Sequence, residues 1–146
     1  MIRRFEDLPV WQDARKLTKE VYMVTEAGNF KNDFRLKGQL QASSVSIMSN
    51  IAEGFENQTT KQFIRYLYIS RGSAGELRSQ LYVAYDIEYI SKKVLLDLKG
   101  QASFVSKQCN GFINYLENYR PPSDRVQEID EDAFLKILSE YYEEDV

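Results

Sequence analysis

The sequence contains no histidine, and this absence restricts the chemistry that the protein can perform. Histidine is the commonest general base near neutral pH, and Glu-x-x-His motifs hold the metals of di-iron helical bundles. Ser46, Ser49, Asn50, Glu53 and Glu76 form a serine and carboxylate set that in principle supports nucleophilic or acid-base work. Because such sets seldom work without a base at hand, we expect no enzyme activity, no cofactor and no metal site.

Cysteine and long apolar runs are also scarce. The single cysteine, Cys109, cannot form an intrachain disulfide and falls on an apolar helical stripe, so we expect a buried, inert thiol in a reducing compartment. The first residues lack the apolar run of a secretion signal, and no segment approaches the length of a membrane span. We therefore expect a cytoplasmic protein without a membrane partner. Its 146 residues suit one domain.

Apolar residues recur at the three-four spacing of amphipathic helices in four segments. We expect helices from Pro9 to Gly28, from Leu36 to Asn57, from Thr60 to Tyr89 and from Ser91 to Pro121. Thr59 and Gln62 form a T-x-x-Q capping box before the third, and Ser91 caps the fourth. No strand pattern competes. The pattern predicts an all-α fold, an antiparallel up-down-up-down four-helix bundle over residues 1–120.

Two helical patterns of small and polar residues, separated by a short turn, fill the segment from Ser43 to Leu77. A turn centred between Asn57 and Gln58 predicts the pairs Ser43 with Gly72, Ala42 with Ser73, Leu40 with Gly75 and Asn50 with Arg65. Paired small residues let two backbones approach closely, which explains glycines that each cost about 1 kcal/mol inside a helix. We interpret Asn50, Glu53, Arg65 and Glu76 as a structural polar network.

The helices carry more aromatic side chains than one bundle interior can hold. Those that lie partly off the inner seam are Trp11, Tyr22, Tyr66, Tyr68, Tyr82, Tyr85 and Tyr89. Nucleobase stacking is one use for such rings. Self-association is the use that the composition favours, because tyrosine is enriched at protein interfaces and few basic residues lie nearby.

Charge divides the chain into two parts. Residues 1–120 hold 17 Lys/Arg and 13 Asp/Glu, whereas residues 121–146 hold 2 and 9. The bundle is therefore mildly basic, and the C-terminal extension is strongly acidic. Phe134, Ile137, Leu138 and Tyr141 follow helical spacing within the extension. We expect a short acidic helix from about Asp130 to Tyr142 that docks onto the bundle or onto a neighbouring subunit.

Three segments carry a family resemblance: FEDLPVWQDARKL, SVSIMSNIAEGF and KQFIRYLYISRGSAGELRSQL. From Arg4 to Tyr119 the chain resembles the 23S ribosomal RNA intervening-sequence family, which includes the accessory variability determinant of diversity-generating retroelements. The resemblance implies a four-helix protomer assembled into a ring-shaped homopentamer. The retroelement members bind nucleic acid and a reverse transcriptase through a basic surface, so the resemblance also suggests an RNA- or DNA-binding role.

The chain departs from the family pattern in the middle of the second helix. Relatives often read L-R-R-A-A-V-S-I-P there, whereas this chain reads LQASSVSIM from Leu40 to Met48, so both arginines are absent. Five copies in a ring would also multiply a net charge of −3. The remaining candidates for a nucleic-acid patch are Arg3, Arg4, Lys61, Arg65, Arg71, Arg78, Lys92 and Lys93. The alternative interpretation is a solvated face, or ion pairs with Glu76 and Asp86.

Three functions from different classes remain open at this point. The first is a homo-oligomeric scaffold or interaction module without catalysis. The second is a nucleic-acid-binding accessory protein of a ribosomal RNA insertion or a reverse-transcriptase element. The third is a serine- or carboxylate-based enzyme. Charge and the lack of histidine favour the first.

Overall fold

The computed structural model describes residues 2–57 and 59–118, together with the single positions 130, 132, 135, 136 and 139. The chain forms four long helices: α1 (Pro9–Thr25), α2 (Phe34–Glu56), α3 (Thr60–Asp86) and α4 (Lys92–Asn118). Two short 3-10 helices, η1 (Phe5–Asp7) and η2 (Gly28–Asn32), precede α1 and α2. Within the described residues there is no strand, so the all-α prediction is confirmed.

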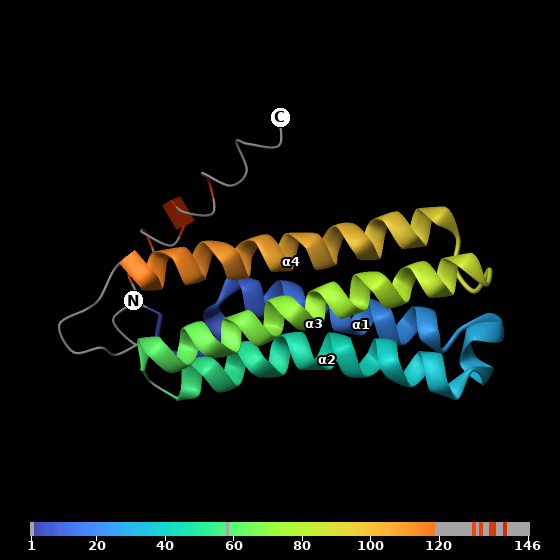
Figure 1. Ribbon diagram of the computed structural model, residues 1–146, viewed down its shortest axis with the longest axis horizontal. Coiled ribbons are helices and arrows are strands. Elements are labelled where there is room, and N and C mark those ends of the chain that lie inside the picture. The colour runs from blue at the N-terminus through green and yellow to red at the C-terminus, as the bar shows by residue number, and fades with distance from the viewer. Residues whose placement is uncertain are drawn as a thin grey trace.

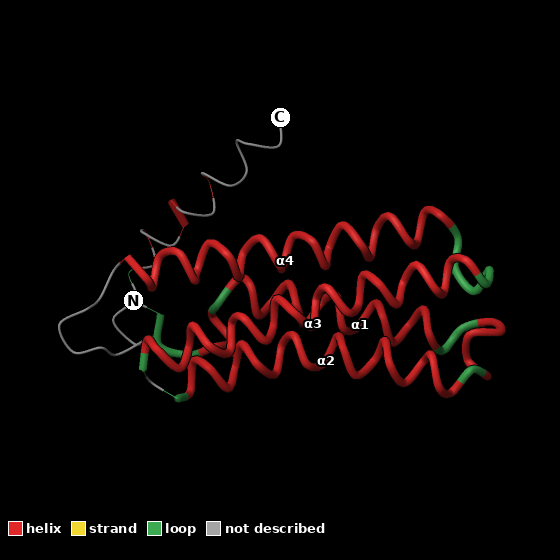
Figure 2. Tube along the Cα trace, in the orientation of Figure 1, coloured by secondary structure: helices red, strands yellow, loops and turns green. Residues whose placement is uncertain are grey.

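The four helices lie side by side along the long axis, and successive helices are joined at alternate ends of the molecule (Figure 1). α1 packs against α2 and α4, and α3 packs against the same two neighbours. Figure 2 shows that the connections are short and gather at the two ends. No helix of the described part of the chain is long and apolar enough to cross a bilayer.

Side-chain caps fix most helix starts. Thr59 Oγ1 accepts a hydrogen bond from the Gln62 amide (3.3 Å), and Ser91 Oγ accepts one from the Val94 amide (3.2 Å). These caps confirm the predicted starts of α3 and α4. α2 begins two residues earlier than predicted, because Asp33 caps it by accepting from the Leu36 amide (3.1 Å).

The end of α3 corrects a prediction, since the helix stops at Asp86 rather than at Tyr89. The Tyr89 amide donates to Ala84 O (2.9 Å), and the Glu88 amide donates to Tyr85 O (3.0 Å). These two bonds form a Schellman motif, in which the residue after the cap takes the left-handed conformation. Glu88 occupies that position with a φ of 64°.

The register between α2 and α3 also corrects a prediction. Ser73 faces Ser46, with the two Oγ atoms 2.8 Å apart, rather than Ala42. Ser70 Oγ donates to Ile47 O (2.9 Å). The pairing is displaced from the predicted register by two residues at Ser70 and by four residues, or one helical turn, at Ser73, because α2 continues to Glu56 and the chain reverses around Thr59.

The glycines of the hairpin have different roles from those predicted. A Cβ at Gly72 would meet nothing within 4 Å, and one at Gly75 would meet only the tip of Arg78 at 3.8 Å. The close approach occurs at Gly54, where a Cβ would lie 2.7 Å from Tyr66 Cβ and 3.0 Å from Phe63 Cδ2. Gly54 therefore lets α2 pack against the first turn of α3.

The core is continuous through the bundle. Phe63 makes edge-on ring contacts with Phe55 and Phe112 at centroid distances of 6.0 and 5.8 Å. Two carboxylate–amide pairs link α1 to α4: Gln108 Nε2 donates to Asp13 Oδ2 (2.8 Å), and Gln101 Nε2 donates to Glu20 Oε2. The pairs lie two turns apart on each helix and fix its register.

Most of the predicted helix from Asp130 to Tyr142 lies outside the described residues. Asp132, Leu135, Lys136 and Ser139 have helical conformation and are exposed. The extent of this helix and its docking remain predictions.

Candidate interaction surfaces

The serine and asparagine side chains between α2 and α3 form a structural network. Asn50 Nδ2 donates to Ser46 O (2.8 Å) and to Ser46 Oγ (3.0 Å). Ser46 in turn bonds Ser73, as described above. The hydroxyl groups are thus engaged in helix-to-helix contacts, and no histidine is present to activate them.

The four residues predicted as one polar network do not come together. Glu53 accepts a hydrogen bond from the Tyr66 hydroxyl (3.1 Å) rather than contacting Arg65. Within the described part of the chain, Arg65 and Glu76 make no hydrogen bond or ion pair, and both are exposed. The one-turn difference in register explains this correction, because it moves Arg65 away from Asn50.

The eight basic candidates do not share one surface. Arg3, Arg4, Lys61 and Arg65 lie near the end of the bundle where α3 begins, whereas Lys92 and Lys93 begin α4 at the other end (Figure 1). The length of α3, roughly 40 Å at 1.5 Å per residue, separates the two groups. Arg4 pairs with Asp7 (3.3 Å).

The two arginines in the middle of α3 differ in their contacts within the protomer. Arg71 Nη1 donates to Asn110 Oδ1 on α4 (2.7 Å), and its guanidinium lies 4.7 Å from the ring centre of Tyr68. Arg78 is half-buried, and its Nε has no hydrogen-bond partner. The ion pairs with Glu76 and Asp86 considered for Arg71 and Arg78 are absent from the described residues.

The side chain of Gln41 makes two hydrogen bonds within the protomer. Gln41 Nε2 donates to Thr25 Oγ1 (3.1 Å) and to Glu26 Oε1 (3.3 Å) at the end of α1. Lys37 Nζ also contacts Glu26 Oε1 (3.0 Å). Bonds from Lys37 and Gln41 lower the pKa of the Glu26 carboxyl below its usual value. This position therefore joins α1 to α2 and offers no cation to a ligand.

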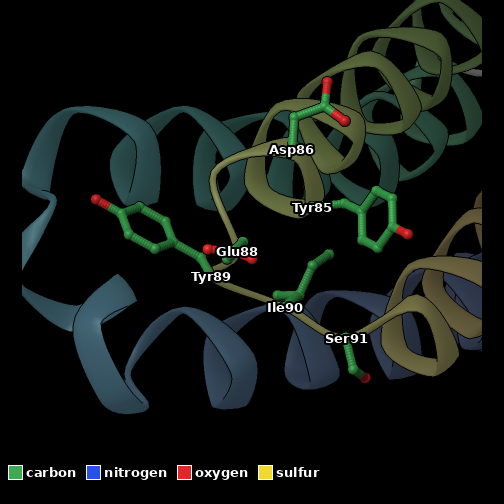
Figure 3. A pocket seen from close by; sticks show the side chains of 6 residues that line it. All are labelled: Tyr85, Asp86, Glu88, Tyr89, Ile90 and Ser91. Atoms are coloured by element: carbon green, nitrogen blue, oxygen red, sulfur yellow. The ribbon is translucent and has the colours of Figure 1, made fainter.

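A pocket of about 600 Å³ lies at the connection between α3 and α4 (Figure 3). It is lined by Tyr85, Asp86, Glu88, Tyr89, Ile90 and Ser91. The Tyr89 hydroxyl donates to Asp33 Oδ2 (3.0 Å), and this bond raises the pKa of the phenol. Ser91 is the cap of α4. The hydroxyl groups of Tyr89 and Ser91 in this pocket thus serve helix ends.

α3 presents more of the exposed large apolar side chains than any other of the four long helices. Tyr68, Ile69, Tyr82, Val83 and Tyr85 are each between 37% and 46% exposed on this helix. We call the surface of α3 that is formed by Gly72, Tyr82 and Val83 the outer α3 face. Sequence reasoning identified the tyrosines, but it missed Ile69 and Val83. The sequence does contain a signal for both: each is an apolar residue immediately next to a position of the buried apolar seam.

A second hollow runs along the beginning of α3, and we call it the α3 groove. It has a volume of about 800 Å³ and is lined by Lys61, Gln62, Ile64, Arg65, Tyr68 and Ile69. It combines an apolar floor with two exposed cations. Such a lining suits an amphipathic, acidic partner.

The predicted burial of Cys109 is confirmed. Its side chain is fully buried, and burial raises the pKa of the thiol to about 12. The charge of Arg71 lowers this pKa by less than burial raises it, so the thiol stays protonated near neutral pH. Among the described residues, no group of histidine, cysteine or carboxylate side chains is arranged to hold a metal ion.

Comparison with known proteins identifies relatives of most of the bundle. Residues 6–111 match the family model of the 23S rRNA-intervening sequence proteins. A crystal structure of a protein of unknown function from the S23 ribosomal protein family of Bacteroides thetaiotaomicron has a similar fold, with a TM-score of 0.65 and 22% identity. The similarity covers 71% of this chain and 97% of that one. No curated protein matches the chain.

Proposed function

This chain belongs to the family of 23S rRNA-intervening sequence proteins, and from that premise we propose that it is a non-catalytic homo-oligomer that acts as a scaffold or interaction module. The protomer is an up-down-up-down antiparallel bundle, and the assembly is a pentameric ring, as the family resemblance implies. A cytoplasmic location remains an expectation from the sequence.

The outer α3 face is the observation that carries this proposal. Val83 is 46% exposed and Tyr82 is 44% exposed, although an isolated protomer gains nothing from solvating them. Gly72 lies between these residues and the α3 groove, in the interior of a helix where glycine costs about 1 kcal/mol relative to alanine. A Cβ there would meet nothing within the protomer. Close approach of a second copy explains both features.

Mass measurement of the purified protein in solution, by light scattering and native mass spectrometry, tests the proposal. We expect a single species of five chains at micromolar concentration. Val83→Asp places a charge on the outer α3 face and should shift the protein to smaller species. Val83→Thr keeps the shape without a charge and should leave the mass unchanged. A monomeric parent protein would refute the proposal.

A second candidate function is that of an RNA- or DNA-binding accessory protein, as in the retroelement members of the family. The observation that favours it is the arrangement of Lys61, Arg65 and Tyr68 in one groove, since cations beside an aromatic ring suit single-stranded nucleic acid. Salt-titrated shift assays with RNA and DNA test this role. Weaker binding by Lys61→Ala or Arg71→Ala, with a smaller salt dependence, would support it.

A further inference from the structure

The α3 groove combines exposed apolar side chains with two cations that have no partner among the described residues. Ile64 is half-buried, Tyr68 and Ile69 are each 42% exposed, and together they provide an apolar strip along α3. Lys61 and Arg65 lie beside this strip. Within residues 2–57 and 59–118, neither cation makes a hydrogen bond or an ion pair. An occupant that matches the groove must therefore be apolar on one face and acidic at its edges.

The C-terminal extension has this chemistry. Residues 121–146 carry 2 basic and 9 acidic side chains. The apolar residues with helical spacing are Phe134, Ile137, Leu138 and Tyr141. On a helix this stripe is about 11 Å long, and the groove from Lys61 to Ile69 is about 12 Å long. Asp130 and Glu131 flank the stripe at its beginning.

The described helical residues of the extension lie outside the apolar stripe. Asp132, Leu135, Lys136 and Ser139 are all exposed. On a helical wheel these four lie on the side opposite the apolar stripe.

The end of α4 lies close to the groove, so the extension of the same chain can reach it. The Tyr68 hydroxyl, which lines the groove, donates to Glu117 Oε1 at 3.4 Å. Glu117 is in the last turn of α4, which ends at Asn118 beside the beginning of α3 (Figure 1). Residues 119–129 can span at most roughly 35–40 Å, so residues 130–142 can reach the groove of the same chain. Tethering gives them an effective concentration on the order of millimolar.

We propose that residues 130–142 bind as a short amphipathic helix in the α3 groove of their own chain. The apolar stripe packs on Ile64, Tyr68 and Ile69. Asp130 and Glu131 supply the carboxylates for Lys61 and Arg65. The inference goes beyond the proposed assembly, because it concerns a contact within one chain. It also explains why a groove lined by two cations occurs in a chain with an acidic extension.

Disulfide trapping in the full-length chain tests the proposal. Ile69→Cys combined with Leu138→Cys should give a fast intrachain crosslink under mild oxidation. The native Cys109 is buried and stays silent. The matched control combines Leu138→Cys with Leu96→Cys, since Leu96 is 54% exposed at the other end of the bundle. The control should crosslink at least about tenfold more slowly, because its effective concentration is lower.

Charge reversal then tests the pairing. Lys61→Glu with Arg65→Glu should slow the Ile69–Leu138 crosslink about fivefold, as expected for the loss of two partly exposed ion pairs. Adding Asp130→Lys and Glu131→Lys should restore the rate. Reversing Lys92 and Lys93, which lie at the far end of α4, should change nothing.

Three results would overturn the proposal. The first is a crosslink no faster than that of the Leu96 control. The second is a crosslink only between two chains, detected by a doubled mass on denaturing gels, which would assign the groove to a neighbouring subunit. The third is an oligonucleotide that binds the groove without slowing the crosslink. The first and third results can be obtained whatever the number of subunits, so a monomeric protein would refute the assembly and leave this contact testable.

Discussion

Asp33 and Tyr89 join two connections that are far apart in the sequence. Asp33 Oδ1 accepts the Leu36 amide as the cap of α2, and Asp33 Oδ2 accepts the Tyr89 hydroxyl at 3.0 Å. Tyr89 also packs on Phe30 of η2, with ring centres 5.0 Å apart. One carboxylate therefore fixes the start of α2 and the α3–α4 connection together.

Asp33→Ala should destabilise the protein by about 1–2 kcal/mol, because it removes both the cap and the acceptor of the Tyr89 hydroxyl. Tyr89→Phe should cost less. In the Tyr89→Phe background, Asp33→Ala should cost less than it does alone, since one of its two bonds is already missing. Urea unfolding followed by circular dichroism measures these differences. Tyr85→Phe, at an exposed tyrosine of the same pocket, is the control and should change little. Strict additivity would contradict the link.

Glu88 is the residue of the same connection that carries backbone strain. With a φ of 64°, a residue with a side chain is disfavoured by about 1 kcal/mol relative to glycine. Glu88→Gly should therefore raise the free energy of unfolding by up to about 1 kcal/mol. Glu76→Gly, in the exposed interior of α3, should lower it by a similar amount. Thermal unfolding of the two variants provides the comparison. A loss of stability for Glu88→Gly would show that its side chain has a role beyond the turn.

Local signals in the sequence are sufficient to predict the helices. Thr59 and Ser91 identify helix starts because a hydroxyl that accepts an amide three residues later needs no tertiary partner. The apolar seams predict which faces are buried for the same reason. Asp33 was missed because it follows η2, where no periodic apolar pattern separates the loop from the helix.

The register between α2 and α3 could not be predicted in the same way. It depends on how the two helices pack where they meet, and the close contact of Gly54 with Phe63 and Tyr66 sets that packing. A local turn signal cannot reveal this contact. The predicted polar network around Asn50 and Arg65 was wrong because it depended on the predicted register. Likewise, sequence spacing does not show whether another helix covers the face of α3 that holds Gly72. Gly72 was therefore predicted to pack closely against α2, although a Cβ there would meet nothing within 4 Å.

Cys109 should be unreactive in the folded protein. With a thiol pKa of about 12, the thiolate fraction at pH 8 is on the order of one in ten thousand, and burial blocks access to it. Labelling with a thiol-specific disulfide reagent should therefore proceed only through unfolding. It should be complete within minutes in strong denaturant. Rapid labelling under native conditions would contradict the burial of this side chain.

Gly54→Ala should destabilise the protein by about 1–3 kcal/mol, because its Cβ would lie within 2.7 Å of Tyr66 Cβ. Gly38 provides the matched control on the same helix. A Cβ at Gly38 would meet nothing within 4 Å, so Gly38→Ala should stabilise the protein by up to about 1 kcal/mol. Chemical denaturation of the two variants tests the opposite signs. Equal effects would show that helix propensity alone, without close packing, governs both positions.

The contact of Glu26 with Lys37 and Gln41 should make stability depend on acidity. Because the folded pKa of Glu26 lies below its ordinary value of 4.5, the stabilisation is fully present above pH 4.5 and is lost as the pH falls through the folded pKa. The stability difference between the parent protein and Glu26→Gln should therefore shrink on acidification below pH 4.5. Glu76→Gln, at an exposed carboxylate that makes no bond within the described residues, should show a smaller change with pH. Parallel pH profiles for the two variants would mean that the bonds from Lys37 and Gln41 do not hold Glu26 in its charged form.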